Sequence, residues 1–172
     1  MLPPMEVVIA LGGNQGDRAS FLTRARDAIE ADAALDVIAS SPLYETAPVG
    51  PPQPHYLNAA LLVRTTLTPD AVLARCLAIE RTLGRIRDVR WGPRTIDLDL
   101  LWADEGDGVP RVVSSDSLSQ PHPHLGERAF ALAPLLDVRP DLEARFGPTL
   151  DRLGGRPPTT AVKGWTSFLR RK

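Results

Sequence analysis

The alternation of apolar and polar positions divides most of the chain into strands and helices. Runs rich in aliphatic and β-branched residues predict strands over 7–11, 37–46, 56–67 and 95–102. Apolar residues at helical spacing predict one helix starting near Asp17 and a second that is capped by Thr68 and Pro69 and ends at Gly84. This β-α-β-β-α-β order is that of a split βαβ unit, so we predict an α+β fold, a ferredoxin-like sandwich.

The remaining third of the chain is less regular and adds further elements to this unit. The pattern predicts a short strand near Val112, a helix from about Glu127 to Leu136 and a small helix over 165–169, separated by Gly- and Pro-rich stretches. We expect a single domain over residues 1–172, with a core over about 6–142 and a C-terminal extension over about 143–172.

Composition excludes several classes of protein. A hydrophobic content of 43% and a charged content of 24% are typical of a soluble globular domain, and a net charge of −1 does not favour binding to nucleic acid or to a membrane surface. The apolar run Val7–Leu11 is too short for a membrane helix and has no basic segment before it, as a signal peptide would. A single cysteine, Cys76, excludes an intrachain disulfide, so we expect a cytoplasmic protein with a buried thiol.

Residues 90–101, Arg-Trp-Gly-Pro-Arg-Thr-Ile-Asp-Leu-Asp-Leu-Leu, hold the main candidate site. On a strand, Asp97 and Asp99 share one face and lie roughly 6.6 Å apart along the chain, where their carboxylates repel unless a cation lies between them. Mg²⁺ is the expected cation, especially where phosphates supply its other ligands. Phosphate contacts are the expected role of the nearby arginines, Arg85, Arg87, Arg90 and Arg94. The alternative is an edge strand with an ordinary solvated face.

Other candidate sites are weaker. The Gly-rich run 12–16 follows a strand and precedes a helix but lacks the lysine of a phosphate-binding loop, so we interpret it as a tight turn. The histidines have no signature around a nucleophile, and one cysteine does not support a zinc site. His122 and His124 flank Pro123, which favours extended backbone, so only one of them should face a given pocket.

A third set of residues suits a flat ligand. Tyr56 and Trp91 lie next to predicted loops, and Asn58 follows closely. Together with Phe130, they could stack on a planar heterocycle and bond its edge. Taken singly, each aromatic residue could equally be part of the core.

Several stretches of the chain together match one known family in order: residues 10–14, 41–50, 56–60, 79–80, 84–87, 90–101, 121–122 and 128–130. In these stretches the chain resembles the 6-hydroxymethyl-7,8-dihydropterin pyrophosphokinase family of folate biosynthesis. The resemblance implies a ferredoxin-like fold and an enzyme that transfers pyrophosphate from ATP to the hydroxymethyl group of the dihydropterin, releasing AMP. It also implies ATP and the pterin as the small-molecule partners, two Mg²⁺ ions, no nucleic-acid or membrane partner and, we expect, a monomer.

The resemblance also implies a role for each matching residue. The metal ligands would be Asp97 and Asp99, with Arg85 and Arg94 as further catalytic residues. The nucleotide would contact Arg85, Arg87, Trp91, Arg94, Leu100, Ser119, His122 and Arg128. The pterin would lie between Tyr56 and Phe130, with Thr46, Val49, Asn58 and Trp91 around it. Glu80 matches an acidic position, for which we expect the orientation of an arginine or of the pterin loop.

Some features depart from this family, and two other classes of protein have to be weighed. Ala47 and Pro123 replace a common proline and tyrosine, and 104–111 contains an insertion. A nucleotidyltransferase also uses a metal-binding Asp-x-Asp, but its Gly-Ser turn precedes the pair by about a dozen residues, whereas Gly12 and Gly13 lie far upstream. An RNA-binding sheet would need exposed aromatics and a basic face, and the sequence indicates neither.

Overall fold

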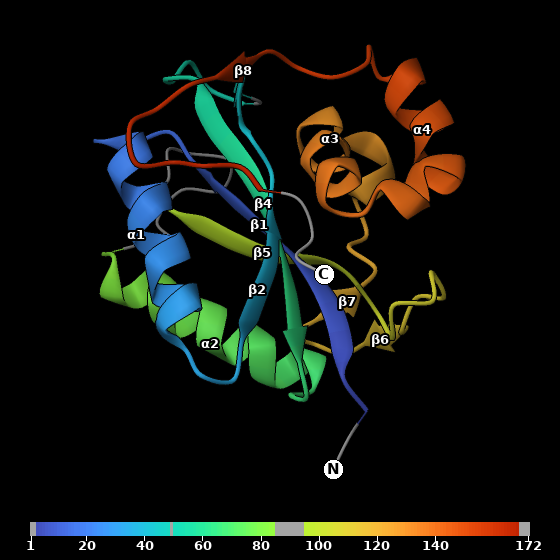
Figure 1. Ribbon diagram of the computed structural model, residues 1–172. Helices are drawn as coiled ribbons and strands as arrows, with labels where there is room; N and C mark the ends of the chain where they lie inside the picture. The colour runs from blue at the N-terminus through green and yellow to red at the C-terminus, as the bar shows by residue number, and fades with distance from the viewer. Residues whose placement is uncertain (1–2, 49, 85–94, 169–172) are drawn as a thin grey trace.

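The computed structural model describes residues 3–48, 50–84 and 95–168, in which an antiparallel sheet lies between two pairs of helices (Figure 1). The strands of the main sheet are β1 (Met5–Gly13), β2 (Asp36–Ser40), β3 (Leu43–Thr46), β4 (Tyr56–Thr65), β5 (Asp97–Asp104) and β8 (Thr159–Thr160), and β6 (Val113–Ser114) pairs with β7 (Ser119–Gln120). The helices are α1 (Arg18–Ala31), α2 (Pro69–Thr82), α3 (Ala129–Val138) and α4 (Glu143–Arg152), with 3-10 turns at Leu125–Glu127 and Pro140–Leu142. The sheet order is β5-β1-β4-β3-β8, and β2 also pairs with β4.

The two predicted helices of the first half are present and begin at residues that the sequence indicates. The Asp17 carboxylate accepts the backbone N–H of Ser20 at 3.1 Å and caps α1. The Thr68 hydroxyl accepts the N–H of Ala71 at 3.2 Å, and Pro69 occupies the first turn of α2. Such caps satisfy backbone donors that have no partner within the helix.

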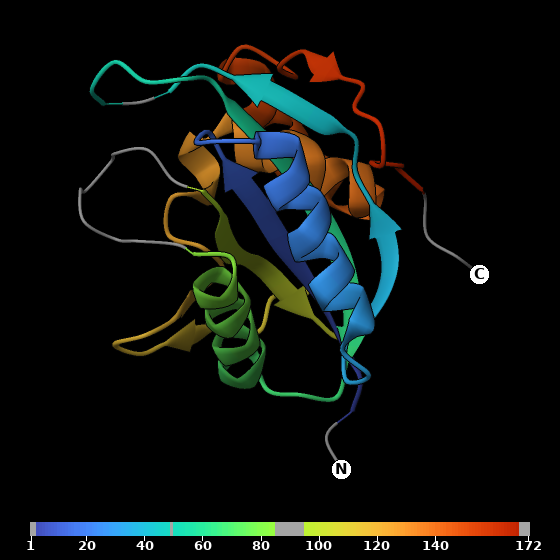
Figure 2. The same cartoon turned by 90° about the vertical axis from the view of Figure 1, so that its left-hand side faces the viewer.

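The central strands bury both faces. Alternate side chains of β1, including Val7 and Ile9, pack in a core against α1 and α2, whereas Val8 belongs to a second core beneath α3 and α4 (Figures 1 and 2). The pairing of β1 with β5 shifts register between Val8 and Ile9, and Leu101 and Trp102 therefore both belong to the second core. Each apolar residue of β1 thus has a defined helix pair to pack against.

Two expectations about the elements are wrong, and one helix was not predicted. The predicted strand over 37–46 is two strands, because Pro42, which has no N–H to donate, separates β2 from β3. Residues 165–168 form no helix, and Phe168 instead makes a bridge to Ser40. Helix α4 was not predicted, since its sequence contains Gly147 and Pro148.

The C-terminal segment runs from α4 past β3 and along α1 (Figure 1). Arg156 donates to Asp137 at 2.5 Å and to the Tyr44 hydroxyl at 3.1 Å, which fixes the segment beside α3. The Arg26 guanidinium lies 4.3 Å from the ring centroid of Trp165, a cation–π contact. These long-range contacts order a segment that has almost no secondary structure of its own.

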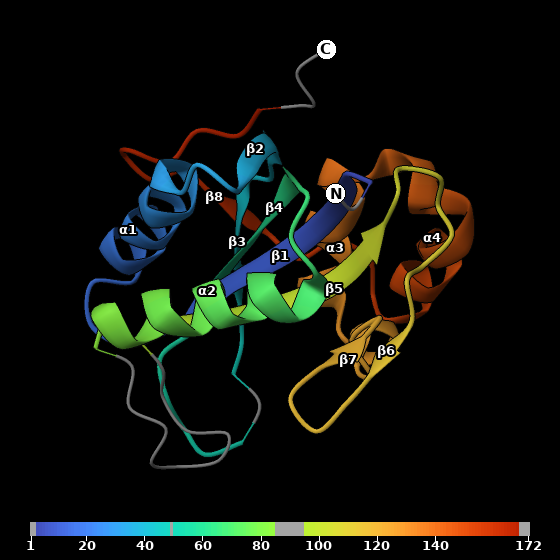
Figure 3. The same cartoon turned by 90° about the horizontal axis from the view of Figure 1, so that it is seen from below.

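A buried ion pair holds the far end of β5. Both terminal nitrogens of Arg139 donate to the Asp104 carboxylate at 2.8 Å, and Arg139 is 1% exposed. Asp104 also accepts the N–H groups of Gly106 and Gly108, so the insertion is an ordered turn, which leads to the β6–β7 hairpin (Figure 3). Burial disfavours the charged form of the Asp104 carboxylate, but the hydrogen bonds from Arg139 and Trp102 outweigh this effect. The pKa of Asp104 is therefore below its usual range.

Candidate active site

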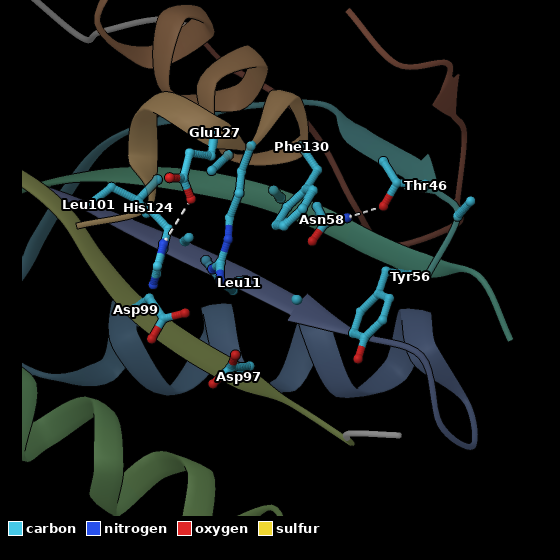
Figure 4. A pocket seen from close by; sticks show the side chains of 16 residues that line it. Leu11, Thr46, Tyr56, Asn58, Asp97, Asp99, Leu101, His124, Glu127 and Phe130 are labelled. Carbon is cyan, nitrogen blue, oxygen red and sulfur yellow. Dashed lines mark hydrogen bonds and ion pairs between the residues drawn. The ribbon is translucent and has the colours of Figure 1, made fainter. Parts of the chain in front are cut away.

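A cavity of about 370 Å³ lies between the sheet and the segment that leads into α3 (Figure 4). Its floor comes from β1, β4 and β5, and its other wall comes from residues 124–131 and from the end of β3. The lining residues are Ala10, Leu11, Gly12, Thr46, Ala47, Tyr56, Asn58, Ala59, Asp97, Asp99, Leu101, His124, Glu127, Arg128, Phe130 and Ala131. Seven of the residues predicted for the site are among them: Thr46, Tyr56, Asn58, Asp97, Asp99, Arg128 and Phe130.

The aspartate pair lies at one end of this cavity. Asp97 and Asp99 both line it, while Leu98 between them is buried against the α1 and α2 side, so the predicted shared face is confirmed. Glu80 of α2, which is 2% exposed, accepts the backbone N–H of Leu98 at 3.0 Å. Glu80 is therefore hydrogen-bonded to β5, the strand that carries the aspartate pair. We did not predict this contact.

The aromatic residues lie at the other end. Tyr56 projects from the start of β4 and Phe130 from α3, and Asn58 lies between them in the view of Figure 4. The Asn58 amide donates to the Thr46 hydroxyl at 2.7 Å. A β-carbon on Gly12 would lie 2.9 Å from the Asn58 side-chain oxygen, so only glycine leaves this amide in place.

Arg128 lines the cavity, and its guanidinium carbon lies 5.7 Å from the Phe130 ring centroid. His122, a predicted nucleotide contact, is not among the lining residues but lies close enough to Arg128 and Asp97 for their charges to act on it. Burial and the positive charges of Arg128 and His124 lower the pKa of His122, while Asp97 opposes this shift. The His122 imidazole is therefore neutral at pH 7, and its Nδ1 accepts the backbone N–H of His124 at 3.1 Å. Its proton consequently resides on Nε2.

Of the two histidines that flank Pro123, only His124 lines the cavity, which fits the expectation that one of them faces a given pocket, although the resemblance assigned the nucleotide contact to His122. Glu127 also lines the cavity and was not predicted. His124 and Glu127 form a pair across one 3-10 turn, with 2.9 Å between His124 Nδ1 and a Glu127 oxygen. Their i, i+3 spacing just before Arg128 was the available signal, since such residues eclipse in a 3-10 helix. Leu101 was also missed, and strand alternation from Asp97 and Asp99 could have found it.

Two predicted nucleotide contacts lie away from the cavity. The Leu100 side chain is buried among the residues that pack on α1 and α2, on the opposite face of the sheet from the cavity. Ser119 is exposed on β7 and is not among the residues that form the cavity wall. Arg85, Arg87, Trp91, Arg94 and Val49 lie outside the described residues.

The two remaining predictions concern a turn and a thiol. Residues 12–16 connect β1 to α1 as expected, and Asn14 donates to the Pro54 carbonyl at 2.8 Å, which ties this turn to the loop before β4. Cys76 is buried as predicted, and burial, with the charges of Glu80 and Asp99, raises its pKa to about 12. A thiol of this kind is inert as a nucleophile at neutral pH.

Residues 8–140 match the sequence model of the 7,8-dihydro-6-hydroxymethylpterin-pyrophosphokinase (HPPK) family. The chain belongs to this family. It is 45% identical over 135 residues to the 2-amino-4-hydroxy-6-hydroxymethyldihydropteridine pyrophosphokinase of Methylorubrum extorquens, covering 78% of this chain and 82% of the relative. It is 40% identical over 158 residues to the protein of the same name from Pseudomonas aeruginosa, covering 91% and 94%.

Solved structures of HPPK proteins share the fold. The chain resembles a crystal structure of HPPK-DHPS in complex with substrates, with a TM-score of 0.62 and 14% identity. The match covers 87% of this chain and 43% of that one, so the present chain spans less than half of that protein. A second similar structure, wild-type HPPK-DHPS from Plasmodium falciparum with pteroate, has a TM-score of 0.56 at 16% identity and is covered over 38% of its length.

Proposed function

We propose that this protein transfers pyrophosphate from ATP to the hydroxymethyl oxygen of 6-hydroxymethyl-7,8-dihydropterin, releasing AMP. The observation that carries the proposal is a single cavity with two chemically different ends, the Asp97–Asp99 pair and the Tyr56–Phe130–Asn58 group. A polyphosphate and a flat heterocycle can therefore meet within it. Family membership supports the same reaction, because the relatives described above are named for it.

The pterin would occupy the aromatic end. The rings of Tyr56 and Phe130 offer faces for stacking, and the buried amide of Asn58 offers a donor and an acceptor for the ring edge. Thr46, which accepts the Asn58 amide, would hold it in register. We include Val49 and Trp91 in the same group on the basis of the family resemblance alone.

The metal end suits Mg²⁺ that is shared with the substrate. Within residues 3–48, 50–84 and 95–168, no group of three or more His, Cys, Asp or Glu side chains is arranged to hold a metal by itself. Two carboxylates fit Mg²⁺, which is commonly bound by one or two carboxylates together with substrate phosphates. Asp97 and Asp99 would hold two ions, which would neutralise charge on the phosphates when bound.

The protein's own groups would mainly position the reactants. The hydroxymethyl oxygen forms a bond to the β-phosphorus, the bond from that phosphorus to the oxygen of the α-phosphate breaks, and AMP leaves with that oxygen. The hydroxyl proton passes to solvent or to Asp97. Arg128 and the Nε2–H of His122 would donate to phosphate oxygens, and Arg85 and Arg94 would assist as catalytic residues, with Arg87 as a further contact.

Several coarser features of the protein are part of the same proposal. We propose a ferredoxin-like fold; if β2 and β3 are taken as one broken strand, the order β5-β1-β4-β2 with α1 and α2 on one face supports it. We propose one domain over residues 1–172, acting as a cytoplasmic monomer without a nucleic-acid partner. In the part of the chain that the structure describes, every helix falls short of the length and apolar character needed to span a membrane.

The test is ³¹P NMR of ATP and Mg²⁺ incubated with the protein and 6-hydroxymethyl-7,8-dihydropterin. We expect AMP and a pterin diphosphate to form together, and formation of ADP would overturn the proposal. Separate titrations of Tyr56→Ala and Phe130→Ala should show pterin binding weakened by about 1–3 kcal/mol, on the scale of base–aromatic stacking, with ATP binding nearly unchanged. Equal loss of both ligands would contradict our placement of the pterin.

A further inference from the structure

The His124–Glu127 pair is part of the cavity wall but has no role in the mechanism above. Both side chains line the cavity at the end that holds Asp97 and Asp99 (Figure 4). The pair is largely exposed, with side-chain exposures of 49% for His124 and 72% for Glu127. An exposed ion pair of this kind contributes little to folding stability, so stability does not account for it.

The contact between the two residues fixes the orientation of the imidazole. A carboxylate can only accept a hydrogen bond, so the nitrogen 2.9 Å from Glu127, Nδ1 of His124, carries a proton. Nε2 lies on the opposite side of the ring, on the side toward Asp99 in Figure 4. The pair therefore presents one nitrogen of known direction to the aspartate end of the cavity.

The surroundings of His124 suit an anion. Its ring centroid lies 5.9 Å from that of His122, and the charges of Arg128 and Asp97 both act on His122. His124 and Arg128 thus line the same cavity as the aspartate pair, His122 lies next to His124 outside the lining, and Glu127 is the acidic group on their own segment. Phosphate oxygens bound at the aspartate pair would come between these donors and the carboxylates.

We propose that His124 is a further nucleotide-binding residue, which donates from Nε2 to a phosphate oxygen of ATP, and that Glu127 is the positioning residue that aims it. An imidazole between a carboxylate at Nδ1 and a phosphate at Nε2 donates a hydrogen bond from each nitrogen, because both neighbours can only accept. Charge-assisted hydrogen bonds of this type are stronger than neutral ones. This assignment rests on the proposed function and adds a donor that the family resemblance did not assign to the nucleotide.

The experiment measures nucleotide and pterin binding separately by calorimetry. The nucleotide probe is α,β-methylene ATP with Mg²⁺, in which the bond that breaks in the reaction is replaced. His124→Ala should weaken its binding roughly tenfold, as expected for loss of a charged hydrogen bond, and pterin binding should stay unchanged. His124→Gln, which keeps a donor near the place of Nε2, should recover part of the loss, and Glu127→Gln should show a smaller loss.

His55→Ala is the matched control, since His55 is exposed and does not line the main cavity. Nucleotide affinity of His124→Ala equal to that of the control would overturn the proposal, and so would equal weakening of both ligands. Perturbation of the His124 Nε2 resonance on addition of the probe, absent with pterin alone, would support it. Failure of the reaction itself is distinguishable, because the wild-type protein would then bind the probe but yield no AMP.

Discussion

Replacing Glu80 tests how the strand with the aspartate pair is held. β5 is the last strand on its side of the sheet, and Glu80 reaches from α2 to accept the Leu98 N–H at 3.0 Å. Because Glu80 is 2% exposed, Glu80→Ala leaves that donor buried without this partner. An unsatisfied buried donor costs about 1–3 kcal/mol, and in a chain of this size each kcal/mol lowers Tm by about 2–4 °C.

The consequence should extend to the metal site, since Leu98 lies between Asp97 and Asp99. Loosening this part of the strand should raise the Mg²⁺ concentration needed for half-maximal turnover a few-fold. Glu80→Gln keeps an acceptor oxygen, so both its loss of folding stability and its rise in the required Mg²⁺ concentration should be smaller. Stability and Mg²⁺ dependence together show whether Glu80 positions the aspartate pair. A purely structural role would lower stability and leave the Mg²⁺ dependence unchanged.

The assay combines urea denaturation with Mg²⁺ titration of turnover at a temperature well below Tm. Glu30→Ala is the control for loss of a helical glutamate, because Glu30 is exposed on α1. If Glu80→Ala unfolds at the same urea concentration as the control, with an unchanged slope, the hydrogen bond does not hold β5 in the way we describe.

Three further predictions concern separate parts of the molecule. Asp97→Asn or Asp99→Asn should abolish turnover with stability near wild type, and activity within a few-fold of wild type in both would refute the metal assignment. Asn58→Ala should weaken pterin binding by about 1–3 kcal/mol without affecting ATP, as titration of each ligand would show. The pKa of Asp104 is lowered in the folded state, so its stabilising contribution is present above the unfolded pKa of about 4 and is lost as pH falls through the folded value. Asp104→Asn should cost about 1–3 kcal/mol at pH 7, because Arg139 loses one charged partner but keeps Asp141 and Glu6, and urea midpoints measured from pH 7 to pH 3 should converge with those of the wild type.

Local signals predicted much of the first hundred residues. Caps at Asp17 and Thr68 and strand alternation around Asp97 each depend on neighbours within a few positions, and the structure confirms them. Pro42 itself indicated the break between β2 and β3, but the apolar pattern continues across it and led us to predict a single strand. The path of the C-terminal segment could not be predicted from neighbouring residues, because it is ordered by contacts between distant residues, such as that of Arg26 with Trp165.

The candidate site could be predicted in part for a similar reason. The aspartate pair follows from strand periodicity, whereas Leu100 was assigned to the nucleotide although the same periodicity turns its side chain to the opposite face. His122 and His124 have similar sequence surroundings, and only the 3-10 turn that brings His124 to Glu127 distinguishes them. Periodicity within one element gives the direction of a side chain, while the partner that it meets depends on how elements pack.

The position of the cavity follows from a change in side-chain size along three neighbouring strands. On the face that packs against α3, aligned positions of β4, β1 and β5 are Leu62, Val8 and Trp102, then Ala60, Ala10 and Asp99, then Asn58, Gly12 and Asp97. The first row is large and apolar and forms the core beneath α3 and α4. The later rows are small or polar, so they cannot fill the space beneath the start of α3, and their polar groups remain directed into it. The strands that form the core beneath α3 and α4 at one end therefore leave room for ligands at the other, with Asp97 and Asn58 in one row across the sheet and Asp99 in the neighbouring row.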